Sequence, residues 1–252
     1  MPKFFVCSDI HSAYTPWMKA LNEAGFDEDN HEHKIIVCGD LFDRLDETQY
    51  VYEFAIDMLQ KDKLIYTLGN HDLLMQQMLN RGFSLWHDRH NGTEKTYHQL
   101  LNAYMDKMDQ DKNPIQIVKD LLQPIYDKTV NYFQTKNYVF CHGFLPVIKQ
   151  SDGSYKINSH WKRASQKNWE NATWLNGMEM VDSGLYLKNK TIVVGHFHAS
   201  WGRAQFEDKP EFGEDSDFSP YYYENKLIAI DSCVAYTDKI NCLVLEDELL
   251  EE

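Results

Sequence analysis

Five short apolar runs in this 252-residue chain each lead into a turn that carries aspartate, asparagine or histidine. The runs are residues 4–7, 34–38, 64–68, 138–141 and 191–194. Continuous apolar runs of this length are typical of β-strands that are buried on both faces, as in parallel sheets. The turns after them carry Asp9 and His11, Asp40 and Asp43, Asn70 and His71, His142, and His196 and His198. Because open α/β sheets bind ligands at the carboxyl ends of their strands, we expect these side chains to gather in one site.

The order of the remaining segments indicates a single α/β domain that spans residues 1–252. Strand and helix patterns alternate up to residue 70, which is typical of a largely parallel sheet. The strand pattern then stops between residues 73 and 135, where we expect a helical insert packed beside the sheet. The tryptophan-rich residues 147–190 receive no secondary-structure prediction. We also expect an exposed loop at 207–220, a closing pair of strands at 227–231 and 240–245, and a frayed acidic tail at 246–252.

The composition is that of a globular protein with an acidic balance. Hydrophobic residues make up 43% of the chain, and 25 Lys and Arg residues against 39 Asp and Glu residues give a net charge of −14. Nucleic acids and anionic membranes repel such a chain, so we expect neither a nucleic-acid nor a membrane partner. No apolar run approaches the length of a transmembrane helix, and residues 1–3 do not resemble a signal peptide, so we expect neither. The odd number of cysteines, five, argues against a disulfide framework and favours the cytoplasm.

The side chains at the five strand ends form a mixed set of possible metal ligands. Carboxylate and amide oxygens together with imidazole nitrogens suit manganese, iron, zinc or nickel better than calcium. The absence of thiolates from the set argues against a structural zinc site. We expect two ions with Asp40 between them, because one bridging carboxylate holds two ions at about 3.5–4 Å, the spacing used in phosphoester hydrolysis. In this scheme a water between the ions loses a proton and becomes the attacking hydroxide.

Three further residues of these turns suit the remaining steps of such a reaction. The leaving oxygen needs an acid, and His71 lies one residue beyond the expected ligand Asn70. The carboxylate of Asp43 would orient this histidine and raise its pKa. The guanidinium of Arg44 offers a bidentate contact to phosphate oxygens.

The ordered set of motifs resembles the calcineurin-like metallophosphoesterases, and most closely the bacterial and phage branch of the phosphoprotein phosphatase family. The family pattern of Asp-x-His, Gly-Asp-x-x-Asp-Arg, Gly-Asn-His-Asp, His-Gly and Gly-His occurs here in the same order. Residues 229–233 are similar to a motif of the family's closing strands. The resemblance implies a four-layer α/β/β/α sandwich, and it leaves the helical insert and the tryptophan-rich segment unmatched.

The resemblance also implies a role for each matched residue. Asp9 and His11 would hold the first metal, Asp40 would bridge, and His71 with Asp43 would form the acid dyad. Arg44 would bind phosphate. The second metal would be held by Asn70, His142 and His196. The Gly-His-x-His ending is similar to the wider superfamily, where the second histidine binds the first metal, and this implies the same for His198.

The chain departs from the protein-phosphatase pattern at a few positions. Ser12 and Leu45 stand where the family usually has glycine, which argues against strict protein-phosphatase specificity more than against hydrolysis. A second phosphate-binding arginine is common in the family. Arg163 and Arg203 are the candidates for it, with a solvated surface arginine as the alternative for each.

These observations favour a metal-dependent phosphoesterase that acts on phosphomonoesters, with phosphoserine or phosphothreonine in proteins as the first expectation. Manganese is the expected metal, and iron, zinc or nickel are alternatives. The same core also supports a dinucleoside-tetraphosphatase or another hydrolase of small nucleotides, and a nuclease is third because the chain has no basic stripe. A non-catalytic scaffold is the alternative of another class, although no ligand position is replaced. The sequence does not predict the oligomeric state.

Overall fold

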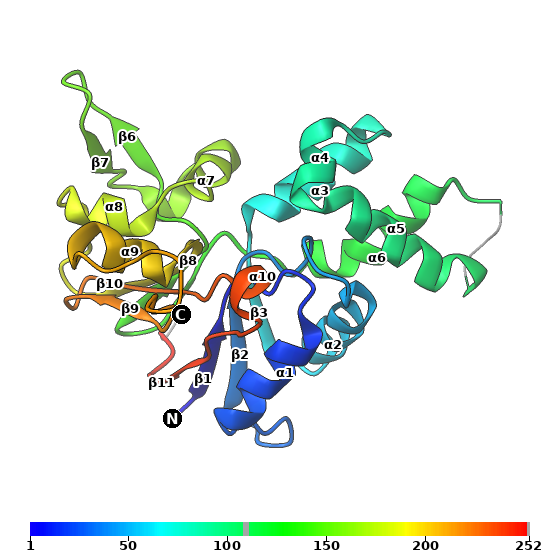
Figure 1. Cartoon of the computed structure of the whole chain (residues 1–252), viewed down its shortest axis with the longest axis horizontal. Coiled ribbons are helices and arrows are strands. Elements are labelled where there is room, and N and C mark those ends of the chain that lie inside the picture. The colour runs from blue at the N-terminus through cyan, green and yellow to red at the C-terminus, as the bar shows by residue number, and fades with distance from the viewer. Residues whose placement is uncertain (108–110, 251–252) are drawn as a thin grey trace.

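The computed structural model describes residues 1–107 and 111–250 and arranges most of its strands in two sheets (Figure 1). The first sheet has the order β11-β1-β2-β3, in which only β11 is antiparallel to its neighbour. Its strands and crossover helices are β1 (Lys3–Cys7), α1 (Tyr14–Glu23), β2 (His33–Cys38), α2 (Thr48–Gln60), β3 (Leu64–Thr67) and β11 (Leu243–Glu246). The buried residues of α2 include Val51, Ala55 and Met58, whose spacing places them on one face of the helix.

The second sheet has the order β4-β5-β8-β10-β9, with three parallel central strands and an antiparallel strand at each edge. Its strands are β4 (Phe133–Gln134), β5 (Tyr138–Phe140), β8 (Thr191–His198), β9 (Tyr221–Tyr223) and β10 (Leu227–Asp231). A separate hairpin and several short helices belong to this half of the molecule. They are β6 (Val147–Lys149), β7 (Tyr155–Ile157), η2 (Trp161–Arg163), α7 (Gln166–Ala172), α8 (Gly177–Asp182) and α9 (Ala199–Phe206). The short helix α10 (Val234–Thr237) follows β10, and its buried Val234 packs in the apolar cluster that contains residues of α1 and α2.

The two sheets pack face to face through one apolar cluster, and each outer face is covered by helices. The cluster between the sheets contains Phe4 and Val6 of β1 together with Val193 of β8 and Ile228 of β10. Alternate residues of β1, such as Phe5, point instead into the cluster shared with α1 and α2. Both faces of each sheet are therefore buried, which explains why the strands are continuous apolar runs. The predicted α/β/β/α sandwich is confirmed.

The helical insert packs against the helices that cover the first sheet (Figure 1). It consists of α3 (Asn70–Arg81), α4 (Trp86–Asn91), α5 (Thr93–Tyr104), η1 (Met105–Lys107) and α6 (Pro114–Tyr126). Leu100 of α5 and Leu122 of α6 are fully buried in the cluster that also contains α2. The predicted end of the insert at residue 135 is wrong, because residues 133–134 pair with β5 in the second sheet. Residues 108–110 of the predicted insert lie outside the described residues.

Two other segments differ from the sequence-based predictions. The predicted closing strands do not pair, because β10 lies inside the second sheet whereas β11 pairs with β1 in the first. The tryptophan-rich segment forms the β6–β7 hairpin and the helices η2, α7 and α8, whose short lengths explain why no periodicity marks them. None of the helices in residues 1–107 and 111–250 is long and apolar enough to cross a membrane.

The acidic tail is not frayed over residues 246–249, contrary to the prediction. Glu246 belongs to β11, and the buried carboxylate of Asp247 accepts hydrogen bonds from the backbone N–H and the side-chain amide of Asn137, at 2.8 and 2.7 Å. Leu249 then pairs with Thr135 beside β4. The tail therefore connects the edge of the first sheet to the second. Residues 251–252 lie outside the described residues.

We predict that Asp247→Ala destabilises the protein by about 1–3 kcal/mol, because it leaves two donors of Asn137 without their buried acceptor. Glu248→Ala is the matched control, because the ion pair of Glu248 with Lys136 is exposed and contributes less than about 1 kcal/mol. Urea unfolding of both variants measures the difference. Equal stability of the two variants would contradict a docked tail.

Candidate metal centre and active site

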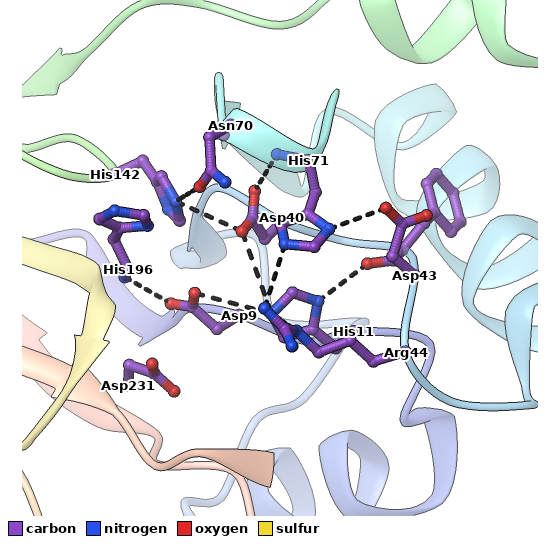
Figure 2. Close-up of polar contacts among 12 residues, drawn as sticks. Asp9, His11, Asp40, Asp43, Arg44, Asn70, His71, His142, His196 and Asp231 are labelled. Atoms are coloured by element: carbon purple, nitrogen blue, oxygen red, sulfur yellow. Dashed lines mark hydrogen bonds and ion pairs between the residues drawn. The ribbon is translucent and has the colours of Figure 1, made fainter. Parts of the chain in front are cut away.

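The five strand ends of the two sheets meet around one cavity of about 300 Å³. Figure 2 shows Asp9, Asp40 and Asn70 from the first sheet facing His142 and His196 from the second. The sequence-predicted residues that line the cavity are Asp9, His11, Asp40, Arg44, Asn70, His71, His196 and His198. His142 is fully buried against Asn70 and Asp40, and Asp43 lies behind His71.

The backbone is strained around this cavity. Eight of the twelve non-glycine residues with positive φ in the described chain are at or next to the site. They are Asp9, His11, Ser12, Asp40, Asp43, Arg44, His196 and Cys233. The left-handed conformation costs about 1 kcal/mol or more for such residues, so it persists only where the surrounding structure enforces it. The tight turns aim polar side chains of neighbouring residues into the same cavity.

Three glycines beside the ligand residues leave no room for a side chain. A Cβ at Gly39 would overlap the ring of His142, and one at Gly69 would overlap the carboxylate of Asp40. A Cβ at Gly195 would overlap the carboxylate of Asp9. Each glycine therefore allows a strand end to approach the polar side chain of another strand.

Backbone carbonyls set the orientation of two imidazoles. Nδ1 of His11 donates to the carbonyl oxygen of Phe42 at 3.0 Å, and Nδ1 of His142 donates to that of Cys38 at 2.8 Å. Because each Nδ1 carries a proton, Nε2 is the ring nitrogen left for a metal ion. Nε2 of His142 lies 2.7 Å from Oδ1 of Asn70 and 3.3 Å from Oδ2 of Asp40. Buried hydrogen bonds of this kind hold metal-binding histidines in one tautomer and one orientation.

The two central carboxylates each use one oxygen to accept a backbone hydrogen bond. Oδ1 of Asp40 accepts from the N–H of His71, and Oδ2 of Asp9 accepts from the N–H of His196, both at 3.0 Å. The other oxygens face the imidazoles. Oδ2 of Asp40 is 3.3 Å from Nε2 of His142 and 4.0 Å from Nε2 of His11, and Oδ1 of Asp9 is 3.9 Å from the latter.

Two groups of donor atoms in this arrangement are close enough to hold a metal ion. One consists of His11, Asp40 and His71, and the other of Asp9, Asp40 and His142; all five residues are buried. Asp40 belongs to both groups. The shared carboxylate is the geometry expected for a bridging ligand between two ions.

The electrostatics of the site also fit divalent cations. Burial raises the pKa of Asp9 well above its ordinary value. Burial opposes a charge on His142, but the carboxylate of Asp40 outweighs this effect and raises the pKa of His142 to about 10. Burial lowers the pKa of His11 well below its ordinary value and that of His196 to about 3, so both rings stay neutral. The neutral imidazoles of His11 and His196 suit a divalent transition ion directly, whereas His142 has to lose a proton when it binds one.

His71, Asp43 and Arg44 form a second unit on the insert side of the cavity (Figure 2). Nδ1 of His71 is 2.7 Å from Oδ2 of Asp43. Burial alone would lower the pKa of His71, but Asp40 and Asp43 outweigh it and raise the pKa above its ordinary value. The exposed Arg44 donates from Nε to Nε2 of His11 at 3.2 Å and lies 3.3 Å from Nε2 of His71 through Nη2. The unit thus places a protonatable imidazole and a guanidinium side by side.

Sequence reasoning missed the residues that hold Asp43. Oγ1 of Thr93 donates to Oδ2 of Asp43 at 2.7 Å, and the N–H of Asp43 donates to Oγ1 of Thr96 at 3.0 Å. Both threonines are buried residues of α5 in the insert. A threonine in a helix carries no signal of such a role, so only the tertiary structure identifies it.

Two further acidic residues, Asp72 and Asp231, lie beside the candidate ligands. Asp72 accepts hydrogen bonds from the hydroxyl of Tyr66 at 2.6 Å and from the N–H of Gly69 at 2.7 Å. Burial and the nearby Asp40 raise the pKa of Asp72 to about 7. Asp231 lines the cavity and accepts from the N–H of Cys233 at 2.7 Å.

The two predicted phosphate-binding arginines do not line the cavity. Arg203 is buried in α9, where it pairs with Asp217 at 2.9 Å and donates to the carbonyl oxygen of Ser219. Its guanidinium therefore anchors the acidic loop. Arg163 is exposed at the end of η2. His198 does line the cavity, and its Nε2 is 3.3 Å from Oε1 of Glu211.

Comparisons with known proteins agree with this geometry. The profile of the calcineurin-like phosphoesterase family matches residues 2–230, so the chain belongs to this family. The predicted resemblance is confirmed, as is the class of enzyme, a phosphoester hydrolase. No curated protein matches the sequence.

Solved structures share the fold at low sequence identity. A protein provisionally identified as a diadenosine tetraphosphatase superposes with a TM-score of 0.55 at 12% identity, covering 97% of this chain and 91% of its own. The cold-active protein-tyrosine phosphatase of a psychrophilic Shewanella species gives 0.55 at 16% identity, covering 98% and 76%. Another structure of a cold-active protein tyrosine phosphatase gives 0.51 at 17% identity, covering 98% and 74%.

We predict that Gly69→Ala lowers the affinity for Mn²⁺ at least about tenfold and destabilises the fold by about 1–3 kcal/mol. Its φ of −102° suits alanine, so the effect arises from the overlap with Asp40 alone. Titration calorimetry measures the affinity. Gly153→Ala is the control, because φ there is +89° but no atom lies near, and it should lose stability without losing Mn²⁺ affinity. Unchanged Mn²⁺ affinity in Gly69→Ala would contradict a role for Asp40 in metal binding.

Proposed function

We propose that this chain is a metal-dependent phosphatase that hydrolyses phosphomonoesters at two divalent ions. The observation that carries the proposal is the position of Asp40, which belongs to both candidate metal groups and also accepts the N–H of His71. A metal site alone would need neither the His71–Asp43 pair nor an arginine at its edge. Their presence favours phosphoester chemistry over metal storage or a scaffold.

The proposed metal ligands follow the family resemblance. They divide the donors differently from the two groups of neighbouring atoms, which place His11 with His71 and Asp9 with His142. We propose Asp9, His11 and His198 for the first ion and Asp40 for both. Asn70, His142 and His196 would hold the second. When bound, the ions supply a water of lowered pKa and neutralise the charge of the phosphoryl group. Manganese is the metal we expect, since oxygen and imidazole donors suit it.

The remaining residues act on the phosphate and on the leaving group. Arg44 is the exposed cation at the cavity, and its planar guanidinium binds the non-bridging phosphate oxygens. His71 holds a proton at Nε2 and donates it to the leaving oxygen. Asp43 accepts from Nδ1 of His71, which orients the ring and stabilises its protonated form.

Membership of the family makes the substrate a phosphoester, and the kind of phosphoester is our proposal. We keep phosphoserine and phosphothreonine proteins as the first candidates from the motif resemblance. Small phosphoesters and nucleotides are the alternative, supported by the structural similarity to a protein provisionally identified as a diadenosine tetraphosphatase. We propose a cytoplasmic location from the odd number of cysteines; the structure describes all five as free thiols.

We predict that metal-stripped protein hydrolyses phosphomonoesters only after manganese is added back. The test compares para-nitrophenyl phosphate, a phosphothreonine peptide and diadenosine tetraphosphate. His71→Ala should lower kcat about 100-fold or more because it removes the acid, and Asp40→Asn should lower the affinity for manganese. His98→Ala, on the exposed side of α5, is the control and should keep full activity. Full activity in both His71→Ala and Asp40→Asn would refute the proposal, and metal binding without any hydrolysis would favour a scaffold.

We predict that Thr93→Val lowers kcat about tenfold and leaves KM within about twofold, because it removes the hydroxyl that holds Oδ2 of Asp43. Valine has nearly the shape of threonine but lacks the hydroxyl, so the change removes the hydrogen bond to Asp43 with little change in side-chain volume. Thr93→Ser retains the hydroxyl, so its kcat should be close to that of the wild-type protein. If Thr93→Ser is as slow as Thr93→Val, the threonine acts through packing and not through Asp43.

A further inference from the structure

The cavity is lined by six residues that the proposed chemistry does not use. They are Asn91, Trp174, Asp231, Cys233, Val234 and Ala235. Trp174 stands out among them, because half of its side chain is exposed although tryptophan is normally well buried. Its ring lies edge to face against the ring of His196, with 6.1 Å between centroids and 87° between planes. An exposed indole therefore lies directly beside a proposed metal ligand.

Trp174 is held through its backbone and through its ring. Its N–H donates to the carbonyl oxygen of Asn171 at the end of α7, at 3.3 Å. Its ring packs edge to face on that of His196. A side chain that already packs against a neighbour loses less conformational entropy when a ligand binds to its other face.

A second apolar surface adjoins the site at His198. The ring of Phe212 lies 5.0 Å from that of His198, and Phe212 packs on Tyr236 at 5.3 Å. About half of each of these two aromatic side chains is exposed. Tyr236 belongs to α10, which also contributes Val234 to the cavity lining. Exposed aromatic side chains therefore lie next to the site on both the Trp174 and the α10 sides, although Phe212 and Tyr236 do not line the cavity itself.

The charges of the lining argue against a long phosphate chain. Arg44 is the sole arginine or lysine among the described residues that line the cavity, and Asp231 adds a carboxylate. A single phosphate would be neutralised by the two ions and Arg44. Further phosphates would extend along apolar residues and Asp231 without a cation, which is costly.

We propose that the cavity selects a phosphomonoester whose leaving group carries an aromatic ring next to the ester oxygen, with Trp174 as the surface on which the ring packs. The inference rests on the proposed phosphatase function. The ring must be close to the ester oxygen because Trp174 touches His196 itself. A phosphotyrosine side chain meets this condition, whereas the base of a nucleotide is separated from its phosphate by the sugar. The expected protein substrate therefore shifts from phosphoserine and phosphothreonine towards phosphotyrosine.

The test compares benzyl phosphate with cyclohexylmethyl phosphate, which have similar size and ester chemistry but differ in the flat ring. We expect the wild-type protein with manganese to have the higher kcat/KM for benzyl phosphate. Trp174→Leu should lower the ratio of the two values about three- to tenfold, because offset stacking is lost while apolar bulk remains. Trp174→Phe keeps a flat ring and should retain most of the ratio. Trp86→Leu is the matched control, since Trp86 is still more exposed, belongs to α4 and does not line the cavity.

An unchanged ratio in Trp174→Leu, or an equal change in Trp86→Leu, would overturn the proposal while leaving the phosphatase function intact. Adenosine monophosphate distinguishes the other source of an aromatic ring. Faster turnover of this nucleotide than of phosphotyrosine, lost in Trp174→Leu, would also overturn it. Absence of all metal-dependent turnover would instead refute the phosphatase function. In that case calorimetry with benzylphosphonate and cyclohexylmethylphosphonate on the manganese-loaded protein still decides whether Trp174 prefers the flat ring.

Discussion

The site depends on the two contacts that the carboxylate of Asp40 makes, one with His71 and one with His142. One oxygen accepts the N–H of His71 in the first turn of α3, where a helix has unpaired donors and a favourable dipole. The other oxygen faces His142, which belongs to the second sheet. A single side chain thus joins the helix that carries the proposed acid to both halves of the sandwich. The imidazoles outweigh the effect of burial and hold the pKa of Asp40 well below its usual range, so the carboxylate stays charged.

The rest of the fold supports this buried charge. Left-handed turns at Asp9 and Asp40 and buried carboxylates oppose folding, and close packing between the sheets has to offset them. The cluster that contains Phe4 and Val193 lies between the sheets, which end at the site. Strand ends that are anchored by such packing can hold a strained turn in one conformation, which is the preorganisation that a metal centre needs.

The parts of the molecule that could be predicted are those with a local signal. A buried parallel strand followed by a polar turn is visible in a few residues, and this pattern identified Asp9, Asp40 and Asn70 before any tertiary information. The pairing of β11 with β1, across more than 230 residues, has no local signal and was predicted wrongly. The contact of Asp247 with Asn137 also joins distant parts of the sequence, so no local pattern predicts it. The single-domain organisation and the individual metal roles stay predictions.

The contacts that hold Asp43 and the surfaces around the cavity come from segments other than the strand ends. Thr93 in the insert holds Asp43, and Trp174 comes from the segment after α7. These two segments are also those that the family motifs left unmatched. A change in the tryptophan-rich segment can alter the leaving group that fits the cavity while the donors from the first sheet stay in place. A change in the insert would also affect catalysis, because Thr93 of α5 holds Asp43, the partner of the proposed acid His71. Substrate selection therefore depends on the tryptophan-rich segment and acid catalysis on the insert, although both take place in the same cavity.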